Sequence, residues 1–171
     1  MITPKELIKL LNAKGYDFDF HEHSALFTVE DSNKLRGEIE GLHSKNLFLK
    51  NKKNSFFLIS CEENDEINLK QISKSLNLGN VSFAKEEYLD QYLNIKPGSV
   101  SPFALLNDKK NQVNFFLEKT LYQSEYVNFH PLVNTLTITI KTNNFLEFMI
   151  ENSKKIHIFS SAEGEILQTY G

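Results

Sequence analysis

The sequence predicts an α+β fold, one domain over residues 1–171 with a mixed, barrel-like β-sheet surrounded by helices. Three observations support this expectation. The length of 171 residues suits a single domain. Apolar residues make up 40% of the chain and include 14 Phe, which is enough for a substantial core. Short apolar or alternating runs outnumber helical patterns, and several are joined by polar turns, which indicates locally paired strands with helices packed outside them.

Helices are expected where a capping residue precedes apolar residues at helical spacing. The first begins in the capping box Thr3-Pro4-Lys5-Glu6, presents Leu7, Leu10 and Leu11 on one face, and ends at Gly15. The other expected helices cover about 31–39, a segment from the cap Asn68 to Gly79, about 85–93, and a last segment capped by Thr142 or Asn143 that presents Phe145, Phe148 and Met149.

Strands are expected in apolar or alternating runs that turn residues bound. These runs are 16–20, 47–50, 56–60, 81–83, 103–106, 113–117, 126–129, 136–140 and the closing strand 156–159. The turn Asn51-Lys52-Lys53-Asn54 predicts a hairpin between the second and third runs. No repeat, linker or low-complexity segment interrupts the chain, so we expect one domain.

The charge balance limits the choice of partner. A net charge of −3 disfavours a ligand held only by bulk positive charge. The exception is the cluster of Lys45, Lys50, Lys52 and Lys53, which suits phosphate contacts or simply keeps a hairpin tip solvated. No uncharged apolar run approaches the ~18 residues of a membrane span, and the first residues do not resemble a signal peptide. We therefore expect a cytoplasmic protein.

Cofactor and metal chemistry have no support in the sequence. Cys61 is the only cysteine, which excludes an internal disulfide and a cysteine cluster within one chain, and its neighbours supply no activating base. His21 and His23 are spaced for one face of a strand, but no third ligand follows at a metal-binding spacing. Since Gly-x-Ser-x-Gly, Walker and Gly-x-Gly-x-x-Gly patterns are also missing, we expect neither metal nor cofactor.

Three segments place polar, backbone-shaping residues beside apolar runs, as a small pocket with a few polar anchors requires. They are Lys45-Asn46-Leu47-Phe48-Leu49-Lys50, Gly98-Ser99-Val100-Ser101-Pro102-Phe103-Ala104-Leu105 and Asn128-Phe129-His130-Pro131-Leu132-Val133-Asn134-Thr135. The ammonium of Lys45, immediately before an apolar strand, could bind an anion or polarise a carbonyl. By residue type alone, a solvated lysine at a strand start explains the pattern better.

Taken together, these motifs resemble the YbaK/ProX-like aminoacyl-tRNA deacylases, and most of all the freestanding Ala-tRNA(Pro) editing proteins. The resemblance rests on Lys45 to Lys50, on Gly98-x-x-x-Pro102-Phe103-Ala104-Leu105 and on Phe129-His130-Pro131-Leu132-x-Asn134-Thr135, in this order and spacing. The segment 27–30 also looks like the one that precedes a helix in that family. The likeness covers nearly the whole chain.

The resemblance implies a hydrolase that cleaves the ester between a wrong amino acid and the terminal adenosine of tRNA. Lys45 would be the key functional residue, Asn46 would orient substrate or water, and His130 would position the amino acid end. The loop from Gly98 to Pro102 would offer backbone groups to the ester. The expected pocket residues are Phe27, Val29, Leu47, Phe129, Val133 and Asn134, and the expected tRNA contacts are Lys34, Arg36, Lys50, Lys52 and Lys53.

Two other functions stay open at this point. The substrate could be Cys-tRNA(Pro) or another mischarged tRNA, which depends on pocket volume. The chain could also be a non-catalytic module that docks on a synthetase or on RNA. The expected partners are the acceptor end of mischarged tRNA(Pro) and a prolyl-tRNA synthetase or elongation factor that adds affinity.

Overall fold

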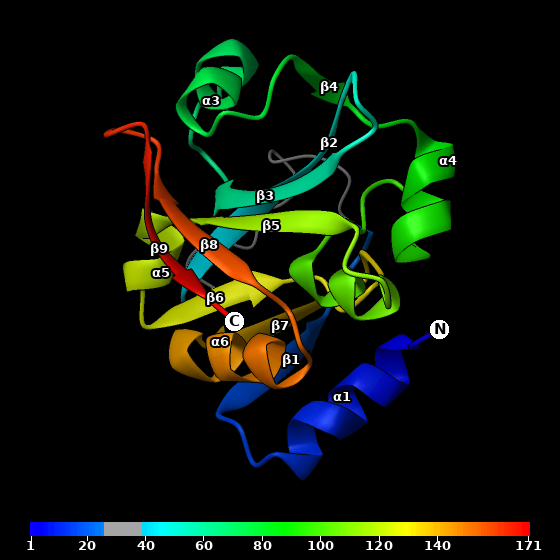
Figure 1. Cartoon of the computed structure of the whole chain (residues 1–171). Helices are drawn as coiled ribbons and strands as arrows, with labels where there is room; N and C mark the ends of the chain where they lie inside the picture. Colours follow the sequence, from blue (N-terminus) through cyan, green and yellow to red (C-terminus); the bar gives the residue numbers. More distant parts are fainter. Residues whose placement is uncertain (26–38) are drawn as a thin grey trace.

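The computed structural model describes residues 1–25 and 39–171 (Figure 1). In chain order the elements are α1 (Pro4–Ala13), β1 (Phe18–Glu22), β2 (Leu42–Asn51), β3 (Phe56–Glu62), α3 (Leu69–Ser75), β4 (Val81–Phe83), α4 (Glu86–Tyr88), the π-helix η1 (Leu89–Leu93), the 3-10 helix η2 (Pro102–Asn107), β5 (Val113–Glu118), α5 (Lys119–Gln123), β6 (Tyr126–Phe129), β7 (Leu136–Lys141), α6 (Thr142–Glu151), β8 (Ile156–Ser160) and β9 (Glu165–Tyr170).

The described strands form one mixed sheet in the order β1-β7-β6-β2-β3-β5-β8-β9, with β4 paired to β2. Strands β3, β5 and β8 run parallel to one another, whereas β2 and β3 form an antiparallel hairpin. The mixed sheet and the outer helices confirm the predicted α+β class. The sheet is not closed, since β1 and β9 are its two edges, so the barrel-like closure expected from the sequence is wrong.

Strand β2 connects the two halves of the sheet. Its first residues pair in parallel with β6, with Leu42 opposite Val127 and His43 opposite Asn128, and its later residues pair with β3 and β4. Gly41 precedes this junction at a φ of 86°, and a Cβ there would lie 2.7 Å from the Tyr126 carbonyl oxygen. Only glycine allows both this conformation and this approach.

Two apolar cores lie on opposite faces of β2 and β3. The larger core holds Phe48, Phe56 and Leu58 together with residues of α1, η2 and α6. The smaller core holds Leu49 and Ile59 beneath α3. Figure 1 shows α3 on one side of the sheet and α1 and α6 on the other. Because successive side chains of a strand point to opposite faces, odd-numbered residues of β2 face the smaller core.

The predicted N-terminal caps of α1 at Thr3 and of α3 at Asn68 are confirmed. Thr3 Oγ1 accepts a hydrogen bond from the Glu6 amide at 3.2 Å, and the Thr3 amide donates to Glu6 Oε2 at 2.9 Å. Leu7 and Leu11 are fully buried, but Leu10 is 44% exposed and lies outside the core. The Asn68 side chain caps α3 through the Gln71 amide at 3.1 Å.

Three other helix predictions were wrong in part: the end of α3, the type of helix over 85–93 and the cap of α6. Helix α3 ends at Ser75, and the left-handed residue that follows is Asn77 at a φ of 56°, so Gly79 does not terminate it. The segment predicted over 85–93 forms α4 and then one π-helical segment. Helix α6 starts at Thr142 itself, after Lys141, so the expected cap at Thr142 or Asn143 is wrong. The helix expected at 31–39 lies outside the described residues except for its last residue.

Several strand expectations were correct within two or three residues, and one was wrong. The segment 103–106 is the 3-10 helix η2, because Ser101 Oγ accepts from the Phe103 amide at 3.2 Å and Pro102 occupies the first helical position. Strand β1 starts at Phe18, two residues later than expected. Strand β2 starts at Leu42, so Lys45 and Asn46 lie within a strand and not before one. Helix α5 and strand β9 were missed, and β8 is therefore not the closing strand.

Candidate active site

Lys45 lies on β2, and His130 directly follows the neighbouring strand β6. The parallel register of β2 with β6 pairs Leu42 with Val127 and His43 with Asn128. The ladder between the two strands ends at the second pair, and Lys45 and His130 each follow that pair by two residues along their own chain segments. Leu42 and Val127 pack against the larger core. Alternation directs His43 and Lys45 to the opposite face of β2, which we call the outer face, and His43 lies close enough to His130 to lower its pKa.

The Lys45 ammonium is held by the loop that follows β3. Its Nζ donates to the backbone carbonyl oxygen of Asp65, and the Asp65 carboxyl group is also close enough to interact with the lysine. Across the hairpin Lys45 pairs with the fully buried Cys61. Burial raises the pKa of the Cys61 thiol to about 12 even though Lys45 lowers it, so the thiol stays protonated and is a poor nucleophile.

His130 presents one ring nitrogen as an acceptor. Its Nδ1 lies 2.8 Å from the Leu136 carbonyl oxygen, so the proton of the neutral ring is on Nδ1 and Nε2 keeps its lone pair. Burial lowers the pKa of His130, and the neighbouring His23 and His43 lower it further, although the Leu136 hydrogen bond opposes them. The imidazole is therefore neutral at pH 7.

Hydrogen bonds between strands fix the outer face around His130. His23 Nε2 lies 2.8 Å from the Thr137 hydroxyl, and the His23 and His130 ring centroids are 6.1 Å apart. Asn128 Nδ2 donates to the Glu40 carbonyl oxygen at 2.8 Å, and its Oδ1 accepts from the Thr139 hydroxyl at 2.6 Å. Sequence reasoning assigned no role to this polar network. The alternation of Thr137 and Thr139 with apolar residues was its one visible signal.

Asn46 faces away from Lys45. Its Oδ1 accepts a hydrogen bond from the fully buried Ser60 hydroxyl, and its Nδ2 donates to Ser44 Oγ at 3.2 Å. Ser44 Oγ in turn donates to the Asn128 carbonyl oxygen at 2.8 Å, which joins β2 to β6. These contacts lie on the face of β2 that carries the larger core. The structure therefore separates the two adjacent residues of the first motif.

The loop from Gly98 to Pro102 approaches the end of β6 from the core side. Gly98 has a φ of 87°, which favours glycine, and Pro102 is buried at the start of η2. The next residue, Phe103, packs edge-on against Phe129 with ring centroids 6.0 Å apart. Because His130 follows Phe129 directly, the start of η2 contacts the strand end next to His130.

The expected pocket residues are divided between the two faces. Leu47 shares the face of Lys45 and packs at the edge of the smaller core. Phe129 is 2% exposed and belongs to the larger core, so it supports the strand end and does not line the outer face. Val133 and Asn134 lie half-buried in the turn between β6 and β7. Phe27 and Val29 lie outside the described residues.

Three of the expected tRNA contacts, Lys50, Lys52 and Lys53, lie within the described residues, toward the tip of the β2–β3 hairpin. Lys52 and Lys53 are exposed at the β2–β3 tip, whereas the Lys50 ammonium lies 5.7 Å from the Tyr88 ring centroid in a cation–π contact. Lys34 and Arg36 lie outside the described residues. Cys61, which pairs with Lys45, lies six residues along β3 from Ser55 at the hairpin turn, and this corresponds to about 20 Å.

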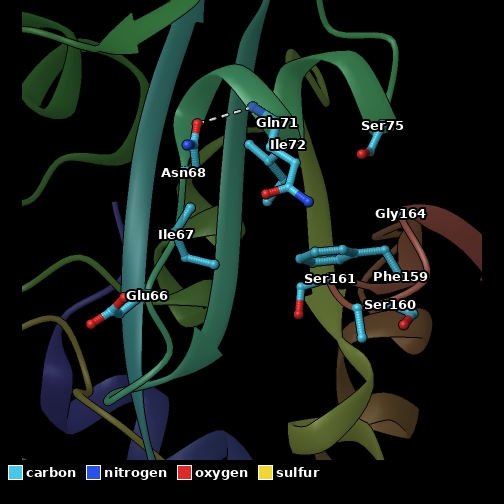
Figure 2. Close-up of a pocket in the computed structure, with 11 residues that line it drawn as sticks. Glu66, Ile67, Asn68, Gln71, Ile72, Ser75, Phe159, Ser160, Ser161 and Gly164 are labelled. Carbon is cyan, nitrogen blue, oxygen red and sulfur yellow. Dashed lines mark hydrogen bonds between the residues drawn. The ribbon is translucent and has the colours of Figure 1, made fainter.

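A small cavity adjoins the loop that holds Lys45. It has a volume of about 160 Å³ and lies between α3 and the β8–β9 turn (Figure 2). Its floor is formed by Ile72 and Phe159, and Glu66 and Gln71 stand at its rim. None of the residues that the sequence suggested for the site lines this cavity. The described residues include no cluster suited to a metal ion, and none of the described helices has the length and apolar character of a membrane-spanning segment.

The mixed sheet and its outer helices are the first indication of the class of protein, and the family comparison gives the second. Residues 23–148 match the aminoacyl-tRNA editing domain. The chain therefore belongs to this family, whose activity is the deacylation of aminoacyl-tRNA. This result confirms the family resemblance and the enzyme class inferred from the sequence motifs.

Individual relatives support the same assignment. Prolyl-tRNA synthetase associated domain-containing protein 1 of Xenopus laevis is 36% identical over 133 residues, which are 75% of this chain and 79% of that protein. The prolyl-tRNA editing protein ProX of Acetoanaerobium sticklandii is 30% identical over 141 residues, 82% of this chain and 86% of that protein. A crystal structure of a candidate trans-editing enzyme for prolyl-tRNA synthetase shares the fold at a TM-score of 0.67 and 13% identity, covering 98% of this chain and 99% of that one.

Proposed function

We propose that the protein is a trans-editing hydrolase that deacylates mischarged tRNA(Pro), with Ala-tRNA(Pro) as its substrate. Two relatives that it matches over most of their length are named for prolyl-tRNA editing or for a domain associated with prolyl-tRNA synthetase. Such a checkpoint suits alanine, because a pocket built for proline rejects the smaller residue weakly, by about 1–3 kcal/mol per methylene. An editing pocket reverses this selection by excluding the larger amino acid.

The observation that carries the proposal is the match of residues 23–148 to the aminoacyl-tRNA editing domain, and the parallel pairing of β2 with β6 brings the segments that lead to Lys45 and His130 side by side. The Lys45 ammonium has donors beyond its contact with the Asp65 carbonyl, since a lysine has three N–H groups. In the reaction, water adds to the ester carbonyl carbon and a negative charge develops on the carbonyl oxygen. Lys45 stabilises this charge or holds the terminal nucleotide next to it.

His130 positions the amino acid end of the substrate. The neutral imidazole offers Nε2 as an acceptor, which can take a hydrogen bond from the α-ammonium group or from the attacking water. The tetrahedral intermediate then breaks the bond between the carbonyl carbon and the ribose oxygen. The ribose oxygen takes a proton, and free alanine and intact tRNA leave.

The other motif residues position or enclose this site. Asn46 acts as a positioning residue, because its hydrogen bonds to Ser60 and Ser44 fix the strand that carries Lys45. The loop from Gly98 to Pro102 offers backbone groups to the ester at the end of β6. Leu47, Val133 and Asn134 form pocket walls and set the size limit.

A deacylation panel tests the proposal. Wild-type protein is expected to hydrolyse Ala-tRNA(Pro) faster than the cysteinyl, seryl or prolyl esters, and Lys45→Ala is expected to abolish this turnover while keeping the fold. A preference for the cysteinyl ester would change the substrate and keep the enzyme class. Tight binding to prolyl-tRNA synthetase or an elongation factor without any deacylation would instead make the chain a non-catalytic module.

A further inference from the structure

Three loops meet at one end of the sheet because of the strand directions. Strands β3, β5 and β8 are parallel neighbours, so the segments before them lie at the same end. These segments are the hairpin turn 51–55, the turn 108–112 and the connection 152–155, and we call them together the basic end. Figure 1 shows the starts of β3 and β5 on the same side of the molecule.

Hydrogen bonds hold the three loops together. Asn114 Nδ2 donates to the Phe56 carbonyl oxygen at 3.2 Å, which joins the start of β5 to the hairpin. Lys154 Nζ donates to the Asp108 carbonyl oxygen and to Asn111 Oδ1, both at 2.7 Å. Asn111 Nδ2 also donates to the Ser153 carbonyl oxygen at 3.3 Å. The loops therefore form one connected surface.

The exposed charge of this surface is positive throughout. Lys52, Lys53, Lys109, Lys110 and Lys155 are exposed. Asp108 is the acidic residue of the three segments, and it is only 4% exposed with its Oδ2 accepting from the Val113 amide at 2.8 Å. In a chain of net charge −3, such a cluster is a marked concentration of positive charge.

A cavity of about 560 Å³ adjoins the basic end, and its lining extends to Ile150 and Gly171. Lys154, Lys155 and His157 line it together with Asn111 and Asn114. Lys154 is only 7% exposed, and both of its hydrogen-bond acceptors are neutral oxygen atoms. The Asp108 carboxyl group also lies close enough to interact with the Lys154 charge, so the attraction for an anion comes from the exposed lysines. Burial lowers the pKa of Lys154, and Asp108 opposes this shift.

We propose that the basic end binds the phosphate backbone of the acceptor stem of the substrate tRNA. This inference rests on the proposed function, because it needs the aminoacyl end of the tRNA at Lys45. The basic end lies about 20 Å from Lys45 along β3, so the two contacts belong to different parts of the same RNA. The single-stranded 3′ end spans the distance, and the stem phosphates meet the exposed lysines.

Salt-dependent binding of uncharged tRNA(Pro) tests this surface without requiring any chemistry. In Lys109→Gln/Lys110→Gln/Lys155→Gln the slope of log affinity against log salt is expected to fall by about 2–3, and the affinity at low salt by about tenfold or more. The matched control is Lys70→Gln/Lys74→Gln/Lys119→Gln, which removes equal charge from segments that follow β3 and β5. The control is expected to keep the wild-type slope.

Substrate length provides a second readout. The advantage in KM of alanyl-tRNA(Pro) over an alanylated CCA trinucleotide is expected to shrink about tenfold in the first triple variant, because the trinucleotide lacks a stem. An unchanged slope, or an equal loss in the control variant, would overturn the proposed surface. Absence of deacylation by the wild-type protein would instead overturn the proposed function, and the binding measurement would still decide the surface.

Discussion

Replacing Asn46 by alanine separates a positioning role from direct contact with substrate. Asn46 accepts a hydrogen bond from the Ser60 hydroxyl and donates one to Ser44 on the core side of β2, opposite Lys45. The substitution removes both bonds and leaves the fully buried Ser60 hydroxyl without its acceptor. Asn46→Ala is therefore expected to reduce stability first and activity only in part.

The expected magnitude follows from these contacts. Each hydrogen bond contributes about 1 kcal/mol to stability, and a buried hydroxyl left without an acceptor adds a penalty of about 1–3 kcal/mol. Since the protein relaxes around the change, we expect a total loss of about 2–3 kcal/mol. With a urea m-value of about 2 kcal/mol/M, the unfolding midpoint falls by about 1 M.

Urea unfolding followed by circular dichroism measures this loss, and a double-mutant cycle assigns it. Ser60→Ala combined with Asn46→Ala removes the hydroxyl that would lack an acceptor, so the interaction free energy between the two substitutions is expected to be about 1 kcal/mol or more. Deacylation by Asn46→Ala is expected to stay within about tenfold of wild type. Unchanged stability together with a loss of more than about a hundredfold in turnover would refute the positioning role.

Two further predictions concern the β2–β6 junction and the histidine. Gly41→Ala is expected to destabilise the protein by more than about 2 kcal/mol, since its Cβ would meet the Tyr126 carbonyl oxygen. Gly15→Ala is the control, because Gly15 also has a positive φ but a Cβ there would have no atom within 4 Å. Equal losses of stability in thermal unfolding of the two variants would contradict the steric argument. Because burial lowers the pKa of His130 from 6.5, kcat/KM is expected to stay level from pH 8 to about 6.5 and to fall only below it as the imidazole takes a proton, and a decline that begins above pH 7 would contradict a neutral His130.

Local chemistry made part of the fold predictable from sequence. The capping box at Thr3 and the cap at Asn68 are determined by residues three positions apart, and both formed as expected. The run 103–106 failed because a short apolar segment has no periodicity that separates strand from helix, and the signal at Ser101 and Pro102 was read as a loop. Strand β9 was missed because its residues are mostly exposed and lack alternation.

The site was harder to predict because it depends on distant pairing. Lys45 and His130 are 85 positions apart (130 minus 45), and the parallel contact of β2 with β6 brings the segments that lead to them side by side. After Leu42, strand β2 continues with the polar residues His43 to Asn46, so its first half was not recognised as a strand. Adjacent residues such as Lys45 and Asn46 suggested a joint role, whereas strand alternation places them on opposite faces.

The central claim is that the Lys45 ammonium and the neutral His130 form one ester-hydrolysing site. Single-turnover deacylation of Ala-tRNA(Pro) by the wild type, Lys45→Met, His130→Asn and the double variant tests it most directly. If the two residues act on one substrate, the double variant is expected to lose little more than Lys45→Met alone, because their effects are not additive within one site. Full turnover by Lys45→Met, or multiplicative losses in the double variant, would contradict the account.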